Sequence, residues 1–136
     1  MKRLFVSVLF IICFSLPTAY SQDNRWVYLG EYRGESIYID SQSIFHNNVY
    51  NYYKVYTKII TSDGRSQVIL EIFYCSNRTY KILDIAMFDN NGNYVFTLPG
   101  DDEIFNVFPE TNPEYVFNYL CKWFWFELLN LNIDYE

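Results

Sequence analysis

Two cysteines, Cys75 and Cys121, constrain the fold of this chain more than any other sequence feature. The chain has three cysteines, and Cys13 lies in an N-terminal apolar segment that we expect to be removed. In an oxidising compartment a remaining pair is most simply a disulfide, which over a loop of this length stabilises a domain by about 4 kcal/mol. The alternative is a thiol nucleophile or metal ligand, for which only His46 offers an imidazole partner.

The N-terminal residues predict export from the cytosol. Lys2 and Arg3 precede an apolar run over residues 4–16, and small residues follow at Ala19 and Ser21. This order is typical of a secretory signal peptide cleaved after Ser21. The run is shorter than the roughly 20 apolar residues of a spanning helix. We therefore expect a removable leader over residues 1–21, no transmembrane segment in the mature chain, and a periplasmic, outer-surface-associated or secreted location.

The charge of the chain argues against a nucleic acid partner. The net charge is −6, and loss of Lys2 and Arg3 makes it more negative, whereas a phosphate backbone is bound by clustered Lys and Arg. Residues 22–136 have the size of one domain. We expect its core over about residues 25–122 and an aromatic C-terminal extension over residues 123–136.

Strand-forming residues dominate the first part of the mature chain, and turn residues recur between them. The pattern predicts strands over residues 26–32, 36–40, 49–60, 67–75, 79–89 and 94–98. Turns are expected around His46, at Asp63-Gly64, which favours a tight hairpin, and at residues 90–93. Connections this short are too small for parallel crossovers, so the sequence predicts an antiparallel meander of about six strands.

A helix is expected near the C-terminus. Thr111 or Asn112 is suited to cap it, with Pro113 in its first turn. From residue 115 helical spacing predicts one buried side made by Val116, Tyr119, Leu120 and Trp123. Residues 123–126 are apolar all round, so their periodicity does not distinguish a helix from a strand, and we favour a helix to about residue 129. Because Cys121 lies on this helix, a bridge to Cys75 would tether the helix to one face of the sheet. The predicted fold class is α+β.

The sequence offers little for catalysis. Nucleophilic hydrolysis needs a base beside its nucleophile, and His46 lies in a polar turn where a solvated side chain is expected. A small hydrolase using Asp101, Asp102 and Glu103 as acid and base is a competing hypothesis, although adjacent acids in a loop are typical of a solvated surface. We expect no enzyme and no cofactor.

Two other short patterns have ordinary structural interpretations. Residues 89–93 place oxygens at alternate positions as calcium loops do, but glycine comes too early and no closing Glu follows. We therefore expect a hairpin turn and no metal site. Asn77-Arg78-Thr79 matches the glycosylation sequon, which is a weak signal in three residues.

Aromatic residues are unusually frequent, with Tyr 14, Phe 12 and Trp 3. Tyr and Trp are enriched at protein-binding surfaces, but a thin sheet with one helix also needs aromatics to fill its core. For residues 123–126, core packing, a subunit interface and membrane contact are all open. The alternating tyrosines near residue 52 favour binding, and the candidate binding surface is Tyr50, Tyr52, Tyr56, Trp123 and Trp125.

A further set of short motifs occurs in order along the chain, namely Trp26-Val27, Tyr38-Ile39-Asp40, Ser43-Ile44, Tyr74-Cys75, Asn77-Arg78-Thr79-Tyr80, Pro109 and Leu120-Cys121. In these residues and their order the chain resembles the bacterial surface-adhesin E-like family of small exported proteins. The resemblance implies a curved antiparallel sheet with a C-terminal helix laid on its concave side and linked to it by the disulfide. It also implies a homodimer that binds host matrix and serum proteins.

Two function hypotheses follow. The leading one is an exported, non-enzymatic module whose partner is a protein, in the manner of a surface adhesin. The alternative is a periplasmic structural or envelope-maintenance protein with no host ligand.

Overall fold

The computed structural model describes residues 24–131, with side chains as far as Lys122. The leader predicted at residues 1–21 lies outside the described residues, and so do the side chains of Trp123 and Trp125.

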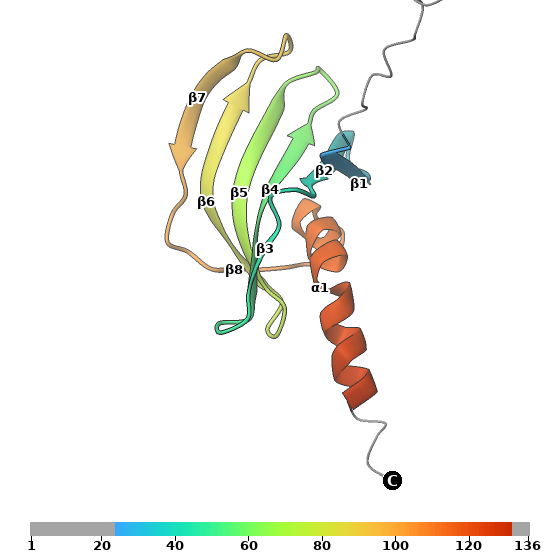
Figure 1. Cartoon of the computed structure of the whole chain (residues 1–136). Coiled ribbons are helices and arrows are strands. Elements are labelled where there is room, and N and C mark those ends of the chain that lie inside the picture. Colours follow the sequence, from blue (N-terminus) through green and yellow to red (C-terminus); the bar gives the residue numbers. More distant parts are fainter. Residues whose placement is uncertain (1–23, 132–136) are drawn as a thin grey trace, which may run out of the picture.

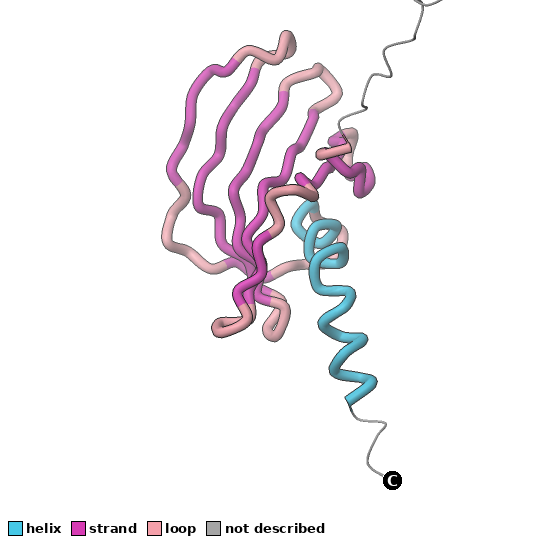
Figure 2. The backbone as a smooth tube through the Cα atoms, in the orientation of Figure 1, coloured by secondary structure: helices cyan, strands magenta, loops and turns pink. Residues whose placement is uncertain are grey.

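The described chain forms one antiparallel sheet and one helix, α1 (Asn112–Leu131). Neighbouring strands follow the order β1, β2, β4, β5, β6 and β7, while β3 pairs with β4 and β8 pairs with β6 (Figure 1, Figure 2). The predicted α+β meander with a C-terminal helix is confirmed. The strands are β1 (Trp26–Tyr32), β2 (Glu35–Asp40), β3 (Phe45–Asn47), β4 (Tyr52–Ile60), β5 (Ser66–Tyr74), β6 (Thr79–Phe88), β7 (Tyr94–Pro99) and β8 (Phe105–Asn106).

The strand predicted over residues 49–60 is too long at its start. The structure begins β4 at Tyr52, and residues 48–51 form a turn. His46 and Asn47, which we expected in a turn, lie instead on β3, which pairs with the first residues of β4.

Asn47 is the physical reason for this difference. Its Oδ1 atom accepts hydrogen bonds from the N–H groups of Val49 and Tyr50, both at 3.0 Å, and so holds the turn closed. Asn51 completes the turn with a φ of 50°, a left-handed conformation that Asn tolerates better than most residues. The predicted turn is therefore shifted to residues 48–51, and His46 and Asn47 end the strand before it.

The apolar core lies between α1 and the sheet face turned toward it, which we call the inner face. Side chains alternate between the two faces of a strand, so in β4 Val55 is buried and its neighbours are not. The helix buries Phe117, whereas Tyr119, predicted to face the sheet, is 41% exposed. Core side chains are Ile37, Ile39, Val55 and Phe73 from the sheet and Val116, Phe117 and Leu120 from α1.

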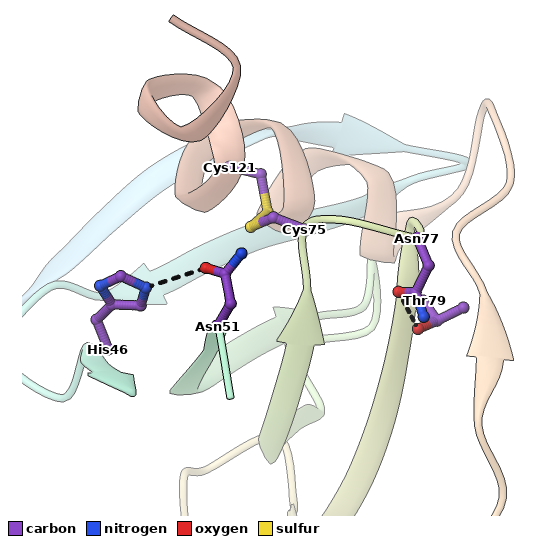
Figure 3. Close-up of a disulfide and its surroundings, with 6 residues drawn as sticks. All are labelled: His46, Asn51, Cys75, Asn77, Thr79 and Cys121. Carbon is purple, nitrogen blue, oxygen red and sulfur yellow. Dashed lines mark hydrogen bonds between the residues drawn. A yellow bond between two sulfur atoms is a disulfide. The ribbon is translucent and has the colours of Figure 1, made fainter. Parts of the chain in front are cut away.

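The predicted disulfide is present. Cys75 follows the last residue of β5 and is bonded to Cys121 in α1, with Cα atoms 5.5 Å apart (Figure 3). Both cysteines are buried in the core. The turn after Cys75 holds the sequon, where the Thr79 hydroxyl donates to Asn77 Oδ1 at 2.8 Å (Figure 3). The bridge therefore ties the closing helix to the end of a central strand.

The start of α1 is held against β1 and β2. The Tyr115 hydroxyl donates to the Glu31 carbonyl oxygen at 3.2 Å, and the Asn112 amide donates to Glu35 Oε2 at 2.6 Å. Of the two predicted caps, Asn112 therefore does not cap the helix, and its Oδ1 atom has no partner. The Thr111 hydroxyl donates to the Phe108 carbonyl oxygen at 2.7 Å. A β-carbon on Gly30 would lie only 2.5 Å from the Tyr115 ring.

Candidate functional site

The sheet face turned away from α1 carries a row of aromatic side chains. On β4, Tyr52 and Tyr56 alternate with the buried residues Val55 and Thr57, so they point to this outer face. The strand pairings place further tyrosines beside them. We call this surface the tyrosine face and define it as Tyr28, Tyr38, Tyr52, Tyr56 and Tyr74.

Cross-strand pairing brings four of these rings together as two separate pairs, with Tyr56 between the pairs on β4. Tyr28 on β1 pairs with Tyr38 on β2, and their ring centroids lie 5.4 Å apart. Tyr52 on β4 pairs with Tyr74 on β5, with centroids 5.9 Å apart in an edge-to-face arrangement. Such pairs stabilise neighbouring strands and hold each ring in a defined orientation. The tyrosine face is thus a preformed aromatic surface.

A hollow of about 230 Å³ adjoins the tyrosine face. It is lined by Trp26, Lys58, Val68 and Phe88, among others. The Lys58 ammonium lies 4.5 Å from the centroid of the Trp26 ring, at cation–π distance. This side of the molecule therefore combines rings with a positive charge in a chain that is acidic overall.

The structure divides the binding residues predicted from the sequence. Tyr52 and Tyr56 belong to the tyrosine face. Tyr50 is 73% exposed but lies in the turn before β4, so it does not share that strand. The side chains of Trp123 and Trp125 lie outside the described part of the chain.

Sequence reasoning missed the other tyrosines of this face, which are Tyr28, Tyr38 and Tyr74. The available signal was the register of the hairpins, because residues paired across an antiparallel ladder point to the same face. Tyr74 becomes the partner of Tyr52 only once the turn at Asp63-Gly64 sets the register of β4 against β5.

The acidic loop does not form a paired-carboxylate site. Asp101, Asp102 and Glu103 are all exposed. Asp102 accepts a 2.7 Å hydrogen bond from Lys81, and that bond, aided by the Lys81 charge, lowers the pKa of the carboxyl. An exposed carboxylate held ionised by a half-buried lysine is poorly suited to act as a general acid.

His46 is exposed as expected, although it lies on a strand. Its ring stacks on Tyr53 with centroids 4.3 Å apart, and its Nε2 atom lies 3.5 Å from Asn51 Oδ1 (Figure 3). These two contacts are with an amide and a tyrosine ring, and they hold the hairpin together.

Residues 89–93 form the hairpin turn that the sequence predicts. Asp89 Oδ1 accepts the N–H groups of Asn91 at 2.9 Å and Asn93 at 2.8 Å, and Gly92 has a φ of 81°. The hydrogen bonds from Asn93 and Asn91 lower the pKa of Asp89. In the described residues, no group of three His, Cys, Asp or Glu side chains is arranged to hold a metal ion.

A family model described as surface-adhesin protein E matches residues 26–122. The chain belongs to the surface-adhesin protein E family. The match runs from β1 into α1 and includes both bridged cysteines, so the family resemblance expected from the sequence is confirmed. No match to the chain was found among curated proteins or among solved structures.

Membership of the surface-adhesin protein E family supports an adhesin-like role for this chain and an exported or surface-associated location. Over residues 24–131, no helix combines the length and apolar character required to cross a membrane.

Proposed function

We propose that this surface-adhesin protein E family member is an exported, non-enzymatic module that binds another protein through its tyrosine face. The observation that carries the proposal is that five tyrosines from β1, β2, β4 and β5 lie on one face of the sheet, four of them in two cross-strand ring pairs. Tyrosine offers a large, rigid contact area with a polar end and is enriched at interface hot spots.

The chemistry of this face indicates the kind of partner. Lys54 and Lys58 lie among the tyrosines on β4, and Trp26 and Phe88 line the adjoining hollow. A partner surface with carboxylates around an apolar or aromatic projection would complement this arrangement. Host matrix and serum proteins are the proposed class. A second copy of the chain is the other candidate, and sedimentation equilibrium would detect it.

A pair of matched variants tests the role of the tyrosine face. Tyr56 and Tyr119 are each 41% exposed, but Tyr119 lies on α1. In a binding assay against extracellular-matrix and serum proteins, Tyr56→Ser is expected to weaken binding at least about tenfold. Tyr119→Ser, with the same loss of aromatic area, is expected to leave binding unchanged. Equal effects from both variants, or no partner at micromolar concentration, would contradict the proposal.

The alternative function is structural or maintenance work inside the envelope with no host ligand. Cell fractionation combined with proteolysis of intact cells separates the two functions. A surface module is degraded by protease added outside the cells, whereas a periplasmic protein is protected until the outer membrane is opened. Protection in intact cells would favour the alternative.

The proposal of a non-enzymatic role rests on the exposed positions of Asp101, Asp102 and Glu103 and on family membership. If Asp102→Asn abolished a measurable hydrolytic activity of the purified protein, that role would be wrong.

A further inference from the structure

A second hollow, on the inner face of the sheet, lies between the start of α1 and the strands β2, β4, β5 and β6. Its volume is about 170 Å³. Five of its lining residues are only half-buried, so it is reached from solvent. We call it the Glu71 pocket. Its apolar walls are Ile37, Ile59, Ile69, Ile82, Pro113 and Val116, and its polar groups are Thr57, Glu71, Tyr80 and Asn112.

Glu71 is the unusual member of this lining. It lies on β5 with an exposed fraction of 4%, among aliphatic walls where an unpaired charge is costly. Burial raises the pKa of its carboxyl to about 7, although a 2.6 Å hydrogen bond from the Thr57 hydroxyl acts in the opposite direction. Tyr80 also lines the pocket, and burial, followed by the charge of Glu71, raises its pKa.

Asn112 contributes an unmatched acceptor. Its Oδ1 atom is buried and has no hydrogen-bond partner, while its Nδ2 atom donates to Glu35. Buried polar atoms are normally paired, and Asn112 is one of the lining residues, so its oxygen is a position that a donor entering beside Asn112 would satisfy. The lining residues include no Lys, Arg or His. The pocket therefore has acceptors in excess and no resident cation.

We propose that the Glu71 pocket binds the ammonium group of a short aliphatic amine. An ammonium has three donors and no acceptor, which matches the Glu71 carboxylate and Asn112 Oδ1. The alkyl chain would lie against the isoleucine walls. A cavity of about 150 Å³ holds benzene, so this pocket suits an ammonium on a chain of about four carbons.

Two sources supply this chemistry, namely a free alkylamine and the side chain of a lysine on another protein. The Glu71 pocket and the tyrosine face lie on opposite faces of the sheet, so this inference does not depend on the proposed function. Either source would place a positive charge beside Glu71, and an ion pair of this kind favours the ionised carboxylate.

The test is a methyl-NMR titration of the full chain with n-butylammonium, following the isoleucine methyl groups. Saturable shifts at Ile37, Ile59, Ile69 and Ile82 are expected, with a dissociation constant on the order of millimolar for so small a ligand. n-Butanol and butyrate, which have similar chains and no positive charge, are expected to bind at least about tenfold more weakly. Shifts of equal affinity with n-butanol, or no saturable shift with n-butylammonium, would overturn the proposal.

A second arm distinguishes the sources of the amine. A single lysine whose backbone amino and carboxyl groups are both blocked carries the same ammonium group, but its alkyl chain is attached to a bulkier backbone. Binding of this compound with an affinity close to that of n-butylammonium would assign the pocket to a protein lysine. Binding of n-butylammonium alone would assign it to a free amine.

Variants and pH provide independent readouts. Glu71→Gln preserves shape and is expected to remove the preference for n-butylammonium over n-butanol, whereas Glu103→Gln, at an exposed site, leaves it intact. In the wild-type chain, affinity should rise from pH 6 to 8 as Glu71 ionises, because the pKa of an alkylamine is about 10. The other titratable groups nearby are Tyr80 and, through Asn112, Glu35. An affinity independent of pH would exclude Glu71 as the anchor, even if the Gln variant failed to fold.

Discussion

The Thr57 hydroxyl donates a 2.6 Å hydrogen bond to the buried carboxyl of Glu71 across β4 and β5. This bond is not sufficient to keep Glu71 fully ionised, because burial raises the pKa of its carboxyl from 4.5 to about 7. The folded chain therefore holds this proton more tightly than the unfolded chain does.

We expect the free energy of unfolding to fall as the pH rises from about 4.5 to 7. In this window the folded state binds more protons than the unfolded state, so raising the pH favours unfolding, by up to about 3 kcal/mol in total. Urea denaturation at a series of pH values measures this change in the free energy of unfolding. Glu71→Gln should flatten this part of the profile, and Glu103→Gln should not. A wild-type profile parallel to that of Glu71→Gln would contradict the assignment.

The Cys75–Cys121 bridge is predicted to supply a large share of the stability. It closes a loop with a sequence separation of 46, and the chain-entropy model assigns such a loop about 4 kcal/mol. Replacing both cysteines with Ala should lower the free energy of unfolding by about this amount under oxidising conditions. Reduction of the wild-type chain should reproduce the loss and leave the double variant unchanged. An unaltered melting temperature in the double variant would show that the bridge does not support the fold.

Substitution of Gly30, where α1 meets β1, is predicted to lower the free energy of unfolding. A methyl group there would meet the Tyr115 ring at 2.5 Å, and overpacking costs about 1–3 kcal/mol. Gly34 is the matched control, because its φ of 79° is also unfavourable for alanine but no atom lies within 4 Å of the added carbon. Thermal denaturation of Gly30→Ala should therefore show the larger loss. Equal losses would mean that the Tyr115 ring moves aside freely.

The ion pair of Arg25 with Asp40 is predicted to matter more than a surface pair. Asp40 exposes 0% of its side chain, and Arg25 Nη2 and Nε lie 2.6 Å and 2.8 Å from its Oδ2 atom. Burial opposes ionisation of Asp40, but the hydrogen bonds from Arg25 and the Gln42 N–H, with the Arg25 charge, outweigh it and lower the pKa. Arg25→Ala should cost about 2 kcal/mol at neutral pH.

This loss should disappear as the pH falls through the lowered pKa of Asp40, because the protonated carboxyl no longer needs the guanidinium. Arg65→Ala is the control, since Arg65 and Asp63 are 65% and 52% exposed and such pairs contribute about 0–1 kcal/mol. Chemical denaturation at neutral and acid pH compares the two variants. A loss for Arg25→Ala that persisted unchanged in acid would point to packing as its cause.

The sequence by itself determined the fold class, the hairpin turns at Asp63-Gly64 and around Gly92, and the pairing of Cys75 with Cys121. These features depend on local chemistry. Alternating side chains, turn residues that favour particular backbone conformations, and a single available thiol partner all act over a few residues or by elimination.

Tertiary structure alone decided which tyrosines share a surface and that Glu71 is buried. The tyrosine face exists because strand register brings Tyr74 beside Tyr52 and Tyr28 beside Tyr38. Glu71 is buried because its strand position faces the start of α1, which folds over it from 41 residues further along the chain, at Asn112. Hairpin register follows only once the exact turn residues are placed, and the docking of α1 on the sheet is a long-range relationship that no local pattern of residue types specifies.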